Sequence, residues 1–201
     1  MSLLGAPLSD QTRDATASAA ELVGRAASGD HAAWRDLIRR YELMVDAVVH
    51  CHGLAGQDAE DARQTVWCRL AEHLDDIRSP DRIGSWIART AHRESARQAR
   101  LARRARALEA GEGPRLLDPV DHRTPESEFL RAEEVRGVRE AIAAIEEPER
   151  TVLALDLHRP GAPAAEVADC TGLALEEVAS VRRRARRRLL RLLRESDTVD
   201  V

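Results

Sequence analysis

Two consecutive helical patterns between Asp58 and Arg106 constrain the fold of this chain most strongly. In the first, four apolar residues recur every four positions and therefore share one helix face: Ala62, Val66, Leu70 and Leu74. After a short break over 76–81, a second pattern places five arginines on one stripe, at about 100° per residue: Arg89, Arg93, Arg97, Arg100 and Arg104. Trp86 begins this stripe, and Ile87, Ala91 and Ala102 lie opposite. The sequence predicts a helical pair with one acidic and one cationic outer face.

Charge is distributed unevenly along the chain. The net charge is −4, and all 31 basic residues are arginines. Residues 182–194 contain eight arginines and no acid, whereas acidic residues collect in 58–76, 126–149 and the C-terminal tail. Such asymmetry favours an anionic partner for the basic segments, although solvated helix faces produce the same pattern.

Length and composition indicate the general class of protein. A chain of 201 residues suits one larger domain or two small ones. No segment approaches the roughly 18 consecutive apolar residues of a membrane span, and the N-terminus lacks the pattern of a signal peptide. The three cysteines have no regular spacing, which fits a reducing compartment. We therefore expect a cytoplasmic protein without membrane insertion.

The apolar periodicity and the breaks predict an all-α fold of two small helical domains joined by a flexible linker. A lead-in over 1–20 precedes the first domain, 21–107, whose second helix starts after Asp30 as N-cap. Trp34, Tyr41 and Trp67 are expected in its core. A Gly- and Pro-containing linker, 108–123, leads to a second domain, 124–195, and an acidic tail, 196–201. Helices are predicted from Thr124 to 145, and over 148–158 and 163–170.

The end of the second domain has the pattern of a helix-turn-helix. A short helix is followed by the turn Thr171-Gly172-Leu173 and by a basic helix from about Leu175. The buried face of that helix is predicted to contain Val178, Val181, Ala185, Leu189 and Leu192. Its other face would present arginines to a DNA major groove and the flanking phosphates.

Metal binding and catalysis find no support. His50-Cys51-His52, with Cys68 as a fourth ligand, suggests a metal site, but consecutive helical residues point about 100° apart and cannot converge on one ion. No motif for phosphate binding or nucleophilic catalysis occurs. We expect no enzyme activity, no cofactor and no metal, and we expect Cys51, Cys68 and Cys170 to be structural.

Three strings of residues, in this order, carry a resemblance to a known family. They are Asp58-Ala59-Glu60-Asp61-Ala62-Arg63-Gln64-Thr65, Trp86-Ile87-Ala88-Arg89-Thr90-Ala91 and Glu166-Val167-Ala168-Asp169-Cys170-Thr171-Gly172-Leu173. Together they resemble the extracytoplasmic-function sigma factors of bacterial RNA polymerase, over nearly all of 21–193. The resemblance implies a factor that directs promoter-specific transcription initiation.

The resemblance also implies partners and site residues. Core RNA polymerase would be bound at the coiled coil of its largest subunit and at its flap region, through Asp58, Glu60, Asp61, Gln64, Cys68 and Glu72. The minus-ten promoter element would be melted and read by Ser79, Arg82, Ser85, Trp86, Arg89, Thr90, Arg93, Arg97 and Arg100. The minus-thirty-five element would be contacted by Glu176, Glu177, Ser180, Arg183, Arg184 and Arg187. An anti-sigma factor is a further partner that the resemblance allows.

A second hypothesis is an autonomous helix-turn-helix regulator that binds an operator as a dimer. Such a regulator needs a domain for dimerisation or ligand sensing before its DNA-binding domain. Residues 31–104 instead show an acidic helix followed by an arginine stripe that begins at Trp86. This arrangement favours the sigma-factor hypothesis.

Overall fold

The computed structural model describes residues 17–109 and 135–197, and the regular secondary structure of these residues is helical throughout, which confirms the predicted all-α class. The N-terminal half contains α1 (Ala19–Ala27), α2 (His31–Cys51), α3 (Gly56–His73) and α4 (Ile83–Glu109). Short 3-10 turns at Leu74–Asp76 and Pro80–Arg82 connect α3 to α4. The C-terminal half contains a helix over 135–143, followed by α6 (Glu149–His158), α7 (Ala164–Thr171) and α8 (Leu175–Asp197). None of these helices is both long and apolar enough to cross a bilayer.

Local capping explains where the first two helices begin. Ser18 and Glu21 form a capping box at α1, because the Ser18 hydroxyl accepts from the Glu21 amide and the Glu21 carboxylate accepts from the Ser18 amide. At α2, Asp30 accepts from the amides of Ala32 and Ala33 at 2.8 and 3.2 Å, as an N-cap residue does. The predicted cap at Asp30 is confirmed.

The apolar faces of α2, α3 and α4 pack into one core. The buried residues include Leu37, Met44 and Val48 of α2, Ala62, Val66 and Leu70 of α3, and Ile87 and Ala91 of α4. Tyr41 is buried with them, whereas Trp34 and Trp67 are only partly buried at the edge of the core. Of the three aromatic residues predicted for the core, Tyr41 alone reaches its centre.

The helix-turn-helix geometry follows from a glycine. Gly172 ends α7 in the left-handed conformation, with φ of 73°, which glycine adopts at little steric cost. After the turn, Val178, Val181 and Ala185 of α8 are buried, as the sequence predicts. Leu189 and Leu192 are partly buried against a second small cluster around Ile145.

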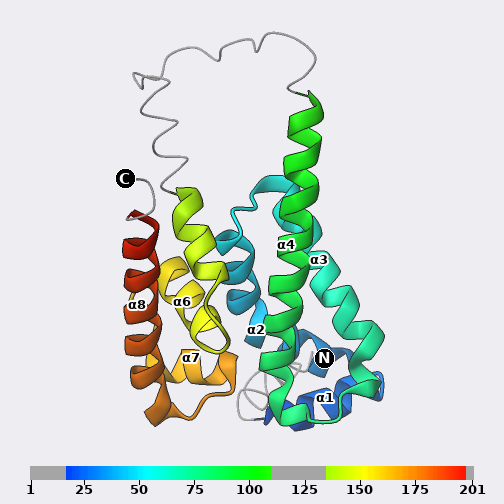
Figure 1. Cartoon of the computed structure of the whole chain (residues 1–201). Helices are drawn as coiled ribbons and strands as arrows, with labels where there is room; N and C mark the ends of the chain where they lie inside the picture. The colour runs from blue at the N-terminus through cyan, green and yellow to red at the C-terminus, as the bar shows by residue number, and fades with distance from the viewer. Residues whose placement is uncertain (1–16, 110–134, 198–201) are drawn as a thin grey trace, which may run out of the picture.

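The described parts of the two halves pack against each other. In Figure 1, α6, α7 and α8 lie on one side of α2 and α4, and α3 lies on the other. One hydrophobic cluster runs from Leu22 in α1 to Val181 in α8. The two halves approach closely at Gly84, where an added Cβ would lie 2.5 Å from the carbonyl oxygen of Cys170. The division into two domains stays a prediction, because the linker from 110 onward and the predicted helix start at Thr124 lie outside the described residues; α4 itself continues to Glu109.

Candidate polymerase and nucleic-acid interface

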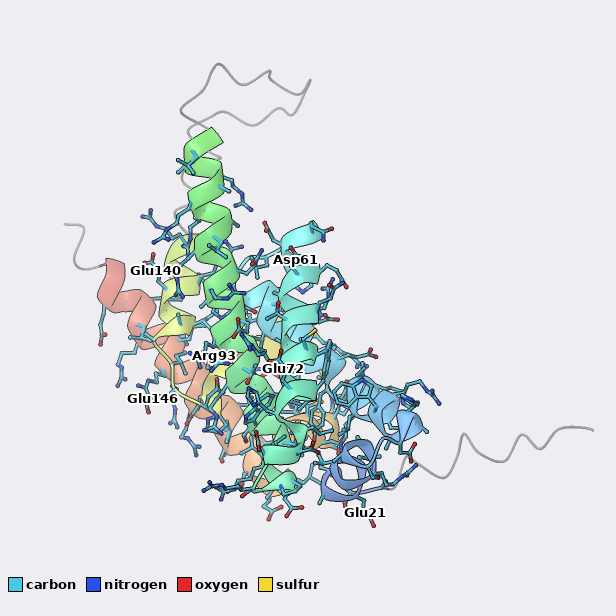
Figure 2. All side chains as sticks on the ribbon, turned by 90° about the vertical axis from the view of Figure 1, so that its right-hand side faces the viewer. Glu21, Asp61, Glu72, Arg93, Glu140 and Glu146 are labelled. Carbon is cyan, nitrogen blue, oxygen red and sulfur yellow. The ribbon has the colours of Figure 1, made fainter. Side chains whose placement is uncertain are left out.

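The outer face of α3 carries most of the residues predicted to bind polymerase. Figure 2 shows Asp61 and Glu72 far apart along this helix. Asp61 accepts from Gln57 at 2.9 Å, and Glu72 pairs with Arg69 at 2.8 Å. The remaining members of this face are Glu60, Gln64 and Cys68, of which Gln64 and Cys68 are exposed. A row of polar and acidic side chains held by partners on its own helix is thus available to a protein partner.

Asp58 is the member of the predicted set that lies apart from the others. Its carboxylate accepts from the Gln98 amide at 3.1 Å and pairs with Arg106 at 3.5 Å. Both partners belong to α4, so Asp58 joins α3 to α4. No local pattern predicts this contact, because the partners lie 40 or more positions along the chain.

The arginine stripe of α4 forms as predicted. Arg89, Arg93, Arg97 and Arg100 are exposed, whereas Glu94, the one acid among them, is 5% exposed. Its carboxylate binds Arg93 at 3.3 Å and Arg97 at 3.0 Å. Glu94 therefore holds two guanidinium groups in place and leaves the surface cationic. Arg93 is labelled on α4 in Figure 2.

A cavity of about 490 Å³ lies where the α3–α4 connection meets the start of α4. Six of the predicted minus-ten residues line it: Ser79, Arg82, Trp86, Arg89, Thr90 and Arg93. Trp86 is partly buried, and its ring meets the His73 ring edge-on with centroids 6.3 Å apart. An aromatic wall flanked by several arginines suits a nucleic-acid base with its phosphates. His73, Asp76, Ile77 and Arg78 also line the cavity, and none of the four is among the predicted site residues.

Two of the residues predicted to contact the minus-ten element are less accessible to DNA than the others. Thr90 is only 5% exposed. Ser85 lies on the side of α4 that faces the helix-turn-helix, and its hydroxyl donates to the Thr171 carbonyl at 3.5 Å. Both residues are sequence neighbours of the stripe, but the segments that pack against α4 decide whether each side chain is accessible.

The basic face of α8 divides into paired and unpaired arginines. Arg182 pairs with Asp156 at 2.8 Å and Arg184 with Glu149 at 2.9 Å, so both are held against α6. Arg183 and Arg187 are exposed, and no partner is seen for them among the described residues. At the start of α8, Glu177 accepts from the Ala174 amide at 3.2 Å, and the Ser180 hydroxyl donates to the Glu177 carbonyl. Glu177 therefore has a capping role, while Glu176 is exposed.

His50, Cys51 and His52 diverge, as consecutive helical residues must. The His50 ring stacks on His158 with centroids 4.9 Å apart, whereas His52 Nε2 lies 3.1 Å from His92 Nδ1. Burial raises the pKa of Cys51 to about 11. Among the residues described, no three His, Cys, Asp or Glu side chains are grouped to hold a metal ion.

The cysteines differ from one another in exposure. Cys170 is buried beside α2, its thiol 3.4 Å from the Arg40 carbonyl, and burial raises its pKa to about 12. Cys51 is partly buried. Cys68 is exposed on the outer face of α3, so the expectation of a structural role is wrong for this residue.

Comparisons with known proteins bear on these surfaces. Over 89% of this chain and 99% of the other, the fold is similar to a solved structure of CnrH in complex with the cytosolic domain of CnrY, with 22% identity and a TM-score of 0.46. No curated protein matches the sequence. The family model for Sigma-70 region 2 matches residues 37–105, which include α3, the cavity and most of α4. For this segment, the match is in line with the resemblance to sigma factors that the sequence predicts.

Proposed function

We propose that this chain is a cytoplasmic sigma factor of the extracytoplasmic-function group, which binds core RNA polymerase and directs it to promoters. The observation that carries the proposal is the coincidence of the Sigma-70 region 2 match with the Trp86 cavity and the arginine stripe. The outer face of α3, from Glu60 to Glu72, is assigned to polymerase. The cavity and the stripe are assigned to the minus-ten element, and α8 to the minus-thirty-five element.

The chemistry of promoter opening supports the assignment to α4. A melted strand needs an aromatic surface on which a base stacks and a cationic path for its phosphates. Trp86 offers the aromatic surface, and the cavity beside it is large enough for one extruded base. Arg89 and Arg93 lie at the same cavity, and Arg97 and Arg100 continue the path along the helix.

Recognition of duplex DNA is assigned to the exposed side of α8. The hydrophobic face anchors the helix to α6, which leaves Arg183 and Arg187 directed away from the core. Arginine forks suit guanine edges and phosphates. Arg184 would contribute once it exchanges Glu149 for a phosphate, a change that its exposed side chain permits.

The proposal is tested by binding to purified core RNA polymerase. Reversing the charge in Asp61→Arg should weaken binding at least about tenfold, equivalent to about 1.4 kcal/mol, because it places a cation in an acidic contact surface. Glu42→Arg is the matched control, since Glu42 is exposed on α2, outside the assigned surface. Affinity is measured by pull-down or fluorescence titration.

Two outcomes would contradict the proposal. Equal affinity of the two variants would remove α3 from the polymerase contact. Nanomolar, sequence-specific binding of duplex DNA by the free chain, without any affinity for core polymerase, would instead indicate an autonomous regulator.

A further inference from the structure

A second cavity, of about 300 Å³, lies between the two halves of the chain and belongs to none of the surfaces assigned above. Its walls come from the end of α2, the far side of α4 from the arginine stripe, the 135–143 helix and α6. Glu140, which also lines it, is labelled in Figure 2 on the 135–143 helix behind α4. Residues from both halves are therefore required to form this cavity.

Among the residues that the structure describes, five guanidinium groups and one carboxylate line the cavity: Arg103, Arg106, Arg136, Arg139 and Arg150, with Glu140. Glu140 lies 3.9 Å from Arg136. Arg150 pairs with Glu147, and Arg106 pairs with Asp58; neither of these two carboxylates lines the cavity. With these three carboxylates counted, the five arginines still leave an excess of two positive charges among the described residues at the cavity.

Two of the arginines have no carboxylate partner among the residues that the structure describes. Arg103 donates from Nε to the Ala99 carbonyl of its own helix at 3.2 Å. Arg139 makes no hydrogen bond or ion pair with any residue that the structure describes. Its guanidinium lies against Gly53, where an added Cβ would come within 2.3 Å of Cζ. Arg139 is therefore packed in place at the cavity wall, and none of the described residues accepts a hydrogen bond from its guanidinium group.

Two histidines, the partly buried His52 and the buried His92, lie beside these arginines and line the same cavity. The pKa of His52 falls to about 4, first through burial and then through the charges of Arg150, Arg103 and Arg139. His92 has its pKa lowered to about 2, by burial and by Arg150 and His52. Arginines from α4, the 135–143 helix and α6 therefore all act on His52, although they are far apart in the sequence.

We propose that this cavity binds a compact polyanion carrying two or more phosphate groups, with Arg103 and Arg139 as its principal ligands. Arginine forks bind phosphate oxygens in pairs, and a cavity of about 300 Å³ matches a small ligand. Walls from four helices enclose it on several sides, which favours a small molecule over a DNA duplex.

Such a ligand would also stabilise the packing of the two halves against each other. It binds residues of both halves and therefore prefers the packed arrangement to any in which they are apart. A ligand present at about 100 times its dissociation constant would favour the packed arrangement about 100-fold. This regulatory consequence rests on the proposed function, whereas binding itself does not.

Binding is tested by calorimetric titration of the full chain with inorganic tripolyphosphate at constant ionic strength. The expected result is saturable binding to one site, weakened at least about tenfold in Arg139→Ala. Arg35→Ala is the matched control, because Arg35 is exposed on α2, outside the cavity and outside the assigned DNA-binding surfaces. The pKa of His52, followed by NMR, should rise when the anion binds. Circular dichroism checks the fold, and Arg103→Ala replaces Arg139→Ala if the latter does not fold.

Non-saturable binding, or equal losses in the cavity and control variants, would overturn the proposal. Tighter binding of a single-stranded oligonucleotide that displaces tripolyphosphate and depends on Arg139 would also overturn it, since the cavity would then belong to a nucleic-acid path. In a separate arm, tripolyphosphate should reduce binding of the wild-type chain to core polymerase but not that of Arg139→Ala. If tripolyphosphate binds the chain but does not change its binding to core polymerase, the regulatory role alone is rejected. If the chain does not bind core polymerase at all, the proposed function is rejected instead.

Discussion

At the scale of single residues, a pair of histidines determines how the packed halves respond to acid. His52 and His92 lie 3.1 Å apart, and His92 Nε2 also lies 3.2 Å from Glu147 and 3.4 Å from the Thr151 hydroxyl. Despite Glu147, burial and Arg150 keep the pKa of His92 low. Both rings are therefore neutral in the folded chain near pH 7.

The free energy of unfolding should fall as the pH is lowered from about 6.5. Unfolded histidine titrates near 6.5, whereas folded His52 titrates near 4 and His92 near 2. Between these values the unfolded chain binds more protons, so stability is complete above about pH 6.5 and is lost at about 1.4 kcal/mol per pH unit per histidine below it.

Urea unfolding between pH 7.5 and 4.5 measures this slope. His92→Gln, which cannot titrate, should reduce it by about half of the histidine contribution. His31→Gln, at an exposed histidine, should leave the slope unchanged. Because both variants contain the same carboxylates, the difference between their slopes is free of the carboxylate contribution. Parallel curves for the two variants would show that His92 is protonated in the folded chain as readily as in the unfolded one.

At the scale of elements, α4 has two cationic faces with different surroundings. The outward stripe was predicted because its periodicity lies within one helix. The face with His92, Arg103 and Arg106 was missed, because the residues that complete it lie at 136, 139 and 150. Local patterns likewise predicted the helices and the turn at Gly172, whereas the orientation of Asp58 and the burial of Thr90 depend on packing between distant segments.

Arg89→Ala and Arg93→Ala should each reduce promoter opening several-fold. Each removes one cation from the cavity beside Trp86, so the slope of binding against salt concentration should also fall by about one. Permanganate reactivity of unpaired thymines measures opening. Arg35→Ala controls for the loss of charge, since Arg35 is exposed on α2. Opening equal to that of the control would exclude the stripe from the melted strand.

At the scale of the whole molecule, the packed halves are too close together to occupy both promoter elements. Elements about 25 base pairs apart are separated by roughly 85 Å, at about 3.4 Å per base pair. A packed body of this size has a radius of gyration of only about 15 Å. Residues of both halves share one hydrophobic cluster. The two halves must therefore separate, and this cluster must open, before the chain can carry out the proposed function.

Gly84→Ala should favour that division. Alanine gains about 1 kcal/mol of helix propensity over glycine, but its Cβ would lie 2.5 Å from the Cys170 carbonyl and 3.1 Å from the Tyr41 ring. The backbone of α7 would have to move, and we expect a net loss of about 1–3 kcal/mol. Denaturant unfolding measures the stability, and small-angle X-ray scattering measures the radius.

Gly24→Ala is the matched control, because nothing lies within 4 Å of a Cβ at Gly24 in α1. This variant should be as stable as the wild type or more stable, with an unchanged radius. If Gly84→Ala also keeps the stability and radius of the wild type, the packing of α7 in the folded chain does not depend on its close contact with α4.

The different exposures of the three cysteines make the chain suitable for site-specific labelling. Cys51 and Cys170 are shielded and hold their protons to about pH 11 and 12, whereas Cys68 is exposed. A maleimide dye added to the unaltered protein near pH 7 should therefore attach at Cys68. That position lies in the middle of the α3 face between Asp61 and Glu72, so the dye would report the arrival of a partner there without any engineered substitution.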